Sequence, residues 1–312
     1  MPTPSKPSPS LTDDQRDAVL ALVDSAGALD GTGALSERSV LALRGLGASH
    51  WLVYVGADLA GYAQLADGTA ELVVDPEHRR AGVGSELLTD LPEDVRVWAH
   101  GDVPAAAAFA AARDLVVVRE LWVLGRRLDE PPALADVVLP QGLTARSFET
   151  GRDEDEWVRV NAAAFVHHPE QGRMTRADLG ARMAEPWFEA AGLVLVVPAD
   201  EPDRVAAFHW TKVHEAGQKG PARVGEVYVV GVDPAYQGRG LGRPVTLLGL
   251  HHLVGLGLRD VILYVDGDNP AALRVYRSLE FTPRSVDRMY ARATNSTARR
   301  AQSSPEGGTM TS

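Results

Sequence analysis

The ten residues Asp233 to Gly242, DPAYQGRGLG, combine glycine and arginine in a pattern that suits the binding of an anion. Glycine lets backbone N–H groups turn toward a ligand, and a helix that starts after the loop adds partial positive charge. Arg239 and Arg243 add full charges, so the loop suits a phosphate or a pyrophosphate. The second glycine is not followed by Lys-Ser/Thr, as a P-loop requires, and the glycine spacing is not that of a dinucleotide fingerprint.

The chain contains a second loop of the same kind. Asp75 to Gly84 read DPEHRRAGVG, 158 positions earlier (233 minus 75). Downstream, VILYVDGDNPAALRVYRSLEF is similar to VRVWAHGDVPAAAAFAAARDL at an offset of 166 (270 minus 104). A repeat of roughly 150 residues is too long for a solenoid and indicates two related globular domains.

Both loops are expected between a strand and a helix. Periodicity predicts a helix after Thr12, whose hydroxyl can cap it, and two strands in HWLVYVGADLAGYAQL with a turn at Gly56–Asp58. LVLVVPADEPDRVAAFHWTKV predicts a second hairpin, GEVYVVGVD and VILYVDG predict strands, and LGRPVTLLGLHHLVGLG predicts a helix. Asn269 is expected to cap a last helix with Pro270 at its first position. The fold class is therefore α/β (α+β), with two tandem domains that each hold a mixed, largely antiparallel sheet flanked by helices.

The stretch LDEPPALADVVLPQG, residues 128–142, predicts the join between the domains, because its three prolines exclude a continuous helix. The N-terminal domain is predicted over 11–130, a linker over 131–142 and the C-terminal domain over 143–293. Residues 1–10 and 294–312 are low in apolar content and are predicted to be disordered tails.

Composition narrows the function classes. The formal net charge of −11 argues against generic binding to nucleic acid or to an anionic membrane. The chain has no cysteine, so disulfides and thiolate metal sites are excluded. No apolar run reaches the roughly 18–20 residues that span a bilayer, and the start lacks the apolar middle of a secretory signal. We therefore expect a cytoplasmic protein that holds no metal, and we expect a monomer.

A family resemblance rests on the two loops. Gln237–Gly242 matches the [Q/R]-x-x-G-x-[G/A] signature of the GCN5-related N-acetyltransferases, and Arg79–Gly84 matches it too. The segment that contains Asn269, Tyr276 and Phe281 resembles the last helix and strand of that family. The resemblance implies that the co-substrate is acetyl-CoA and that the loop holds its pyrophosphate.

The same resemblance assigns the cofactor contacts. In the C-terminal domain these are Val230, Gly231, Val232, Gln237, Gly238, Arg239, Gly240, Leu241, Gly242, Arg243, Asn269 and Arg274. In the N-terminal domain they are Leu72, Val73, Val74, Arg80, Gly82, Gly84 and Ser85. One departure from the family lies at Glu280, where many members have glycine. A left-handed turn at a glutamate would cost about 1–2 kcal/mol.

N-acetyl transfer needs one group that takes a proton from the amine and another that protonates the departing thiolate. Alternation along the strand predicts that Glu226, Tyr228 and Val230 share one face. Glu226 is the candidate base, acting through a water or by binding the amine directly; the alternative is a solvated acid near a strand end. The resemblance assigns the acid role to Tyr276; the alternative is a half-buried core tyrosine.

The N-terminal copy lacks both groups. The offset of 158 sets Gly68 against Glu226, and the offset of 166 sets Ala110 against Tyr276. Glu71 lies three residues out of register, which predicts that it occupies the opposite strand face. We therefore expect the N-terminal domain to bind CoA, now or formerly, without catalysing transfer.

The chain as a whole resembles one tandem member of the family, and the stretches HPEQG, FHWTKVH and GEVYVVGVDP carry this resemblance. It implies a small-molecule amine acceptor, a cysteinyl–glucosaminyl–inositol conjugate, bound between the domains. The implied acceptor contacts are Glu37, Glu170, Lys212, Glu226 and Tyr264.

Simpler interpretations stand beside these assignments. Glu37 could be an exposed acid of an early helix, Glu170 a loop residue and Lys212 a solvated strand lysine. Trp210 could stack on a sugar, although core packing is favoured, and His167 and His168 form no convincing metal site. Two other functions are open: acetylation of another small amine, such as an aminoglycoside, and non-catalytic sensing of acetyl-CoA.

Overall fold

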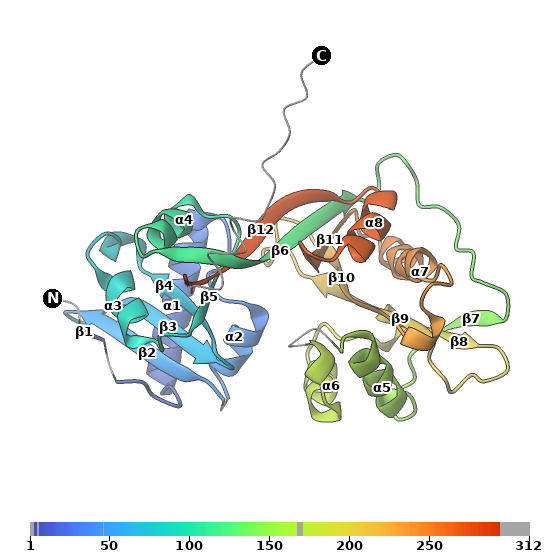
Figure 1. The fold of residues 1–312 in the computed structure, drawn as a ribbon, viewed down its shortest axis with the longest axis horizontal. Coiled ribbons are helices and arrows are strands. Elements are labelled where there is room, and N and C mark those ends of the chain that lie inside the picture. Colours follow the sequence, from blue (N-terminus) through green and yellow to red (C-terminus); the bar gives the residue numbers. More distant parts are fainter. Residues whose placement is uncertain (1–2, 5, 46, 167–170, 294–312) are drawn as a thin grey trace, which may run out of the picture. The chain divides into compact units, whose positions relative to one another are not determined.

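The computed structural model describes residues 3–4, 6–45, 47–166 and 171–293 (Figure 1). The chain forms two compact units, of which the first comprises 1–121 with 285–312 and the second comprises 122–284. Strands β6 (Leu115–Arg127) and β12 (Thr282–Arg292) contribute residues to both units. No helix within the described ranges is long and apolar enough to cross a membrane.

The division between the units falls inside β6 and β12, whereas the sequence places the join at 128–142. Leu124 already packs in the core of the second unit, and the Arg126 guanidinium donates to the carbonyl of Leu279. Conversely, Arg288–Tyr290 pair antiparallel with β5 (Arg96–Ala99) of the first unit. Strand pairing therefore sets the boundary, while residues 128–142 form neither helix nor strand, as their prolines predict.

The first unit is built on a mixed sheet in the order β1-β2-β3-β4-β5-β12. Its strands pair antiparallel except for β4 and β5, which are parallel. Its other strands are β1 (Thr3–Pro4), β2 (Ser49–Val55), β3 (Asp58–Ala66) and β4 (Thr69–Val74). Its helices are α1 (Asp13–Asp30), α2 (Glu37–Ala42), α3 (Val83–Asp90), α4 (Pro104–Ala111) and the short η1 (Pro76–His78).

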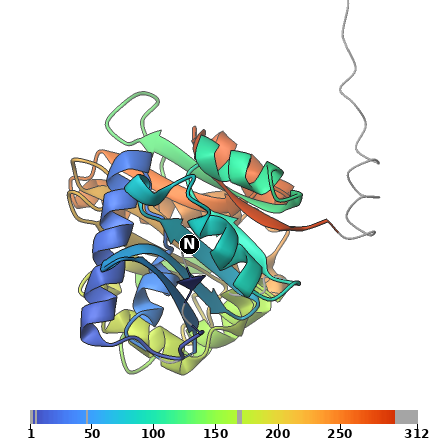
Figure 2. The same cartoon turned by 90° about the vertical axis from the view of Figure 1, so that its left-hand side faces the viewer.

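Helices cover both faces of this sheet. Helix α1 lies along one face, where Val19 and Leu22 pack with Val73 (Figure 2, dark blue helix). Helix α3 covers the opposite face, where Leu87 packs with Ala70. Thr12 caps α1 as predicted, accepting from the Gln15 amide while Gln15 accepts from the Thr12 amide. The helix therefore begins at the residue that its capping signal indicates.

The second unit has a sheet in the order β6-β11-β10-β9-β8-β7. Its other strands are β7 (Leu143–Ser147), β8 (Leu193–Pro198), β9 (Ala207–His214), β10 (Val224–Val232) and β11 (Asp260–Asp266). Its helices are α5 (Glu154–Ala164), α6 (Arg176–Met183), α7 (Gly242–Gly255) and α8 (Pro270–Ser278). Three short 3-10 turns are η2 (Gln171–Arg173), η3 (Ala190–Gly192) and η4 (Pro234–Tyr236).

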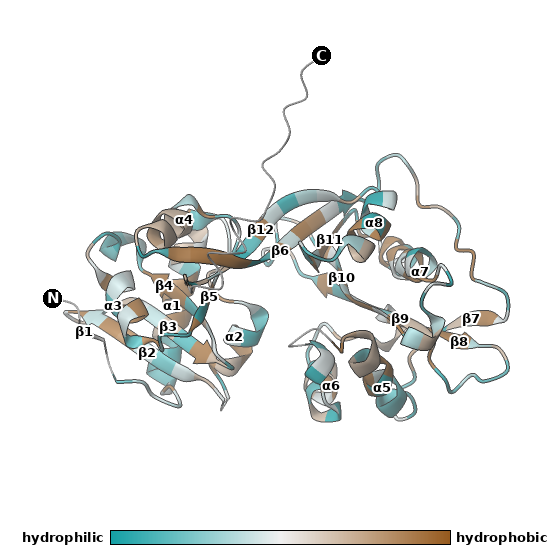
Figure 3. Cartoon of the chain, viewed as in Figure 1, coloured by the Kyte–Doolittle hydropathy of each residue, from teal (hydrophilic) through white to brown (hydrophobic). Residues whose placement is uncertain are grey.

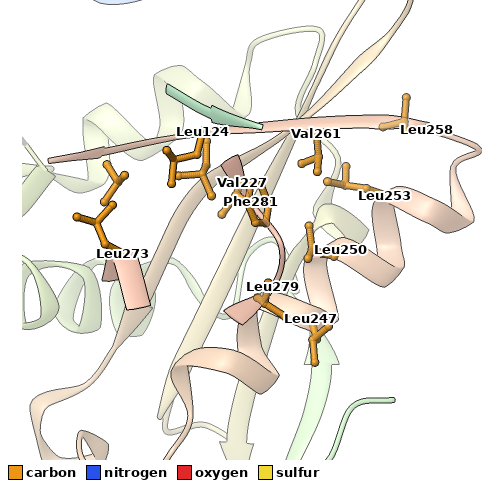
Figure 4. Close-up of a cluster of buried hydrophobic side chains, with 12 residues drawn as sticks. Leu124, Val227, Leu247, Leu250, Leu253, Leu258, Val261, Leu273, Leu279 and Phe281 are labelled. Carbon is orange, nitrogen blue, oxygen red and sulfur yellow. The ribbon is translucent and has the colours of Figure 1, made fainter. Parts of the chain in front are cut away.

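The core of the second unit has two layers. Figure 1 shows α5 and α6 on one side of its strands and α7 and α8 on the other. On the α7 side, Leu250 and Leu253 face Val227 and Phe281 (Figure 4). Burial of each leucine contributes about 1.5–3 kcal/mol. The close packing of α7 depends on a glycine, because a Cβ at Gly249 would lie 2.1 Å from the buried ring of His209.

The local predictions agree with the structure in both units. The two hairpins form, and Asn269 accepts from the Ala272 amide at the start of α8. Glu280 adopts the left-handed conformation expected of the family's glycine, with φ of +60°. In Figure 3 the first part of β6 is brown because Leu115–Val118 is an aliphatic run. The predicted fold class, with mixed sheets flanked by helices in a tandem arrangement, is confirmed.

Candidate active site

The glycine loop of the second unit has the backbone geometry of an anion cradle. Gly238 and Gly240 both have φ of +76°, and no atom lies within 4 Å of the position that a Cβ would take at either residue. Asp233, which precedes the loop, accepts from the Ala235 amide and from the Arg159 guanidinium. The loop is therefore held at its base and open at its tip, which suits backbone donation to a phosphate group.

Side chains complete this loop. Leu241 is buried against α7, whereas Gln237, Arg239 and Arg243 are exposed. The Arg239 guanidinium lies 4.9 Å from the centre of the Tyr236 ring, and the Gln237 amide donates to the carbonyl of Val232. Gly242 begins α7, so the N-terminus of that helix adds its partial positive charge.

Strand β10 separates from β11 before it reaches the loop. The two strands pair in parallel from Gly225–Val227 to Val261–Leu263, although β10 continues to Val232. A bulge interrupts β10 at Tyr228, because its pairing with β9 shifts between Val227 and Val229. Within the described residues, backbone groups beyond the bulge, including those of Val230 and Gly231, make no pairs with β11. The opening between the strands suits the entry of a thioester.

The bulge changes which residues share a face. Val227 packs on the α7 side and Val229 on the α5 side, although strict alternation would place them together. Val230 returns to the α7 side, so the prediction that it shares a face with Glu226 and Tyr228 is wrong. Glu226 and Tyr228 remain together on the α5 side.

Glu226 forms a buried pair with His214. The histidine Nε2 lies 2.5 Å from the carboxylate Oε2, and the side chains are 8% and 9% exposed. His214 ends β9 opposite Val224, so it reaches Glu226 diagonally across the two strands. The alternative of a solvated strand-end acid is therefore wrong.

Lys212 lies directly opposite Glu226 and is buried as well. Its ammonium lies 4.6 Å from the centre of the Trp187 ring and 5.4 Å from that of Tyr228. The Tyr228 hydroxyl accepts from Nε of Arg182 on α6. The solvated-lysine interpretation is thus wrong, and polar groups, cations and aromatic faces meet beside the carboxylate. Such a surface suits a polar amine better than an apolar ligand.

Tyr276 lies on α8, and its ring packs edge-on against Phe281. The residue is half-buried, and burial of its hydroxyl raises the pKa to about 12. This hydroxyl keeps its proton at neutral pH, as a general acid must. Asn269 at the helix cap and Arg274 on α8 are exposed on the same helix.

The remaining predicted contacts are scattered. The Tyr264 hydroxyl on β11 accepts from the Lys219 ammonium at 3.0 Å. Glu37 is exposed in the first turn of α2 in the first unit. Glu170, with His167 and His168, lies outside the described residues. Trp210 is fully buried among aromatic rings, so stacking on a sugar is excluded. The described residues contain no group of three or more ligands arranged for a metal ion.

The loop of the first unit repeats the same backbone geometry. Arg80 and Gly82, at the positions of Gly238 and Gly240, have φ of +65° and +92°. The Arg79 guanidinium donates to the carbonyl of Val74, as Gln237 does to Val232. The predicted contacts Leu72, Val73 and Val74 end β4, and Gly84 and Ser85 lie in the first turn of α3.

The strand before that loop, β4, changes which residue of the first unit corresponds to Glu226. Strand β4 pairs with β3 without a bulge. Removing the bulge shifts the register by one residue, so Thr69, and not Gly68, is the counterpart of Glu226. Glu71 is then two residues away on the same face, toward α1 and α2, and the predicted opposite face is wrong. Thr69 and Ala110 still offer no carboxylate or phenol at the two catalytic positions.

Sequence reasoning missed His214, Trp187 and Arg182. A signal for His214 was present, because FHWTKVH places Lys212 and His214 two residues apart on one strand face. Their partner on β10 depended on the hairpin register. Arg182 and Trp187 lie outside any motif, and only tertiary packing brings them to Tyr228.

Comparison with known proteins agrees with this geometry. The model of the acetyltransferase (GNAT) family matches residues 157–281. The mycothiol acetyltransferase of Thermomonospora curvata is 50% identical over 293 residues, covering 91% of this chain and 95% of that protein. That of Rhodococcus erythropolis is 48% identical, covering 91% and 98%.

Solved structures show a similar fold over both units. A tandem GNAT protein from the clavulanic acid biosynthesis pathway superposes with a TM-score of 0.67 at 19% identity, covering 93% of this chain and 98% of that one. A GCN5-related N-acetyltransferase from Sphaerobacter thermophilus gives 0.62 at 22% identity, covering 90% and 93%.

Proposed function

Because the chain belongs to the mycothiol acetyltransferase family, we propose that it transfers acetyl from acetyl-CoA to the cysteinyl amine of a cysteinyl–glucosaminyl–inositol conjugate. The product would be mycothiol, so this is the last step of its biosynthesis. The observation that carries the proposal is the buried carboxylate of Glu226, which lies just before β10 separates from β11. A cytoplasmic location and a monomeric state are part of the proposal and rest on the sequence.

The loop residues Gln237–Arg243 would hold the pyrophosphate of acetyl-CoA. The positive-φ glycines support this assignment, because the space beside their Cα atoms is open and a phosphate group can approach the backbone closely. The part of β10 that pairs with β9 but not with β11 would take the pantetheine side, and the Val230 amide would donate to the thioester carbonyl. Such a donor stabilises the negative charge that develops on that oxygen during attack. Asn269 and Arg274 would add contacts from α8.

Glu226 would take a proton from the ammonium of the acceptor and so free the lone pair for attack. After attack, the nitrogen loses its second proton to water, and the C–S bond breaks as Tyr276 gives its hydroxyl proton to the CoA sulfur. Glu226 releases the proton it took to solvent. Solvent then returns a proton to the phenolate. The pKa of about 12 supports this role, because Tyr276 enters each turnover protonated.

The acceptor side would be formed by Lys212, Glu226 and Tyr264 in the second unit. A polyol and an ammonium need hydrogen bonds and charge, and these groups supply both. Glu37 and Glu170 complete the set that the family resemblance implies. We also propose that the first unit binds CoA without catalysis, because it repeats the cradle and has Thr69 and Ala110 at the catalytic positions.

The test compares wild-type protein with the full-length variants Glu226→Gln and Tyr276→Phe. Turnover is followed by loss of thioester absorbance and by the mass of the product, because the acceptor carries a thiol of its own. Each variant should lose about 10²–10⁴-fold in kcat while it still binds acetyl-CoA. Glu215→Gln and Tyr54→Phe, at exposed positions, serve as matched controls and should keep wild-type rates.

Two results would contradict the proposal. Activity of both variants within a fewfold of wild type would mean that the second unit is not the sole catalytic centre. Equal rates with the cysteinyl conjugate and with an aminoglycoside would mean that the acceptor has been assigned wrongly.

A further inference from the structure

The pair of His214 and Glu226 is more than a packing contact. A carboxylate that is 9% exposed is costly to keep ionised unless donors compensate for the lost water. Within the described residues, Nε2 of His214 is the hydrogen-bond donor to this carboxylate, and it engages Oε2 alone. The other oxygen, Oε1, makes no hydrogen bond to the described part of the chain. One oxygen is therefore held and the other is left for a ligand.

The strand register makes this orientation rigid. His214 and Glu226 lie on adjacent antiparallel strands, and the register places their side chains diagonally across from each other on one face. The bulge lies at Tyr228, two residues after Glu226, and the pairing of β10 with β11 ends just before it at Val227. The held carboxylate thus lies at the edge of the opening, with its unpaired oxygen available to an amine.

We propose that His214 is a positioning residue for the acetyl transfer. Its Nε2–H holds Oε2 of Glu226 and so orients the carboxylate, which leaves Oε1 to accept the proton of the amine. The inference rests on the proposed function and adds a residue to it. His214 itself would not touch the acceptor. Its effect would pass through Glu226, because the Nε2–H donor forms a hydrogen bond to the charged carboxylate.

Other charged or titratable groups face the same region and must be kept constant in any test of pH dependence. Lys212 approaches from β9, and Tyr264 with its partner Lys219 approaches from the β11 side. Tyr228 with its partner Arg182 approaches from the α6 side. Substitution at His214 leaves all of these groups in place.

The experiment compares His214→Phe, which keeps the ring volume without a donor, with His214→Gln, which keeps an amide donor. The pH profile of kcat/KM is measured for each full-length variant, together with acetyl-CoA binding by calorimetry. We expect the acid limb of the profile to move to higher pH in His214→Phe and to stay near the wild-type position in His214→Gln. At neutral pH, kcat of His214→Phe should fall by about tenfold or more, while acetyl-CoA affinity stays unchanged.

A double-variant cycle separates positioning from a general structural role. If His214 acts through Glu226, adding His214→Phe to Glu226→Gln should not reduce the residual rate further. The inference is overturned if the two substitutions multiply, or if the profile of His214→Phe superimposes on that of wild type. Should His214→Phe fail to fold, His214→Asn, whose shorter amide cannot reach Oε2, replaces it.

Failure of the inference about His214 can be distinguished from failure of the proposed function. If wild type does not acetylate the cysteinyl conjugate, the proposed acceptor is wrong. The profiles are then measured with whichever small amine the wild type does acetylate. A shifted acid limb with that amine still supports the role of His214, and an unshifted limb overturns it.

Discussion

Replacement of His100 by glutamine will remove a pH-dependent contribution to the stability of the first unit. His100 lies between two buried carboxylates: its Nδ1 is 2.8 Å from Asp287 Oδ2 and its Nε2 is 3.3 Å from Glu71 Oε1. Asp287 lies on β12 and also accepts from the Gly101 amide. Glu71 lies on β4 and accepts from the Ser36 amide. The imidazolium therefore holds the last strand to the middle of the sheet.

The magnitude follows from the proton affinity of the histidine. Burial alone would lower the pKa of His100, but the hydrogen bond to Asp287 and the ion pair with Glu71 raise it to about 9 from the ordinary 6.5. At 1.36 kcal/mol for each tenfold change in affinity, this difference corresponds to about 3 kcal/mol. Because the folded-state pKa is raised, this stability is fully present below pH 6.5 and is lost as the pH rises through 9.

The assay is hydrogen exchange of peptides from β5 and β12, measured at pH 7 and pH 10 and corrected for intrinsic exchange rates. Wild type should lose about 2–3 kcal/mol of protection between these values, and His100→Gln should be less protected at pH 7 with little further loss. His251→Gln, at an exposed position on α7, is the control. Equal losses in wild type and His100→Gln would refute the reasoning.

Three further substitutions test the backbone features. Gly240→Ala should weaken acetyl-CoA binding about tenfold in calorimetry, since alanine is strained at φ of +76°. The control is Gly255→Ala, because no atom lies within 4 Å of the Cβ it would add. Equal affinities of the Gly240→Ala variant and wild type would contradict the assignment of the loop as an anion cradle. Gly249→Ala should cost about 1–3 kcal/mol in urea unfolding, because its Cβ would meet the His209 ring; an unchanged midpoint would contradict this packing. Glu280→Gly should stabilise the protein by about 1 kcal/mol in the same assay, because φ is +60° there, and a loss of stability would contradict the strain.

The sequence could predict those features that depend on residues close together in the chain. The two glycine loops, the caps at Thr12 and Asn269 and both hairpins are encoded by neighbouring residues. Their energetics depend on φ preferences and on hydrogen bonds that span three or four positions. Glu226 and Tyr276 could be selected because the family motif fixes their distance from those loops. For the same reason the left-handed turn at Glu280 could be anticipated.

The tertiary structure determined the features that depend on the register between strands. A single bulge at Tyr228 reversed the face of Val230 and moved the counterpart of Glu226 to Thr69. The residues around Tyr228 do not predict the bulge, because a bulge is defined by two residues of one strand opposing a single residue of its partner. The contact of His214 with Glu226 and the pairing of β12 with β5 of the first unit also depend on strand pairing and could not be predicted from neighbouring residues. The sequence alone therefore determined the chemical groups and the loops that carry them, and pairing between distant strands determined which of those groups meet.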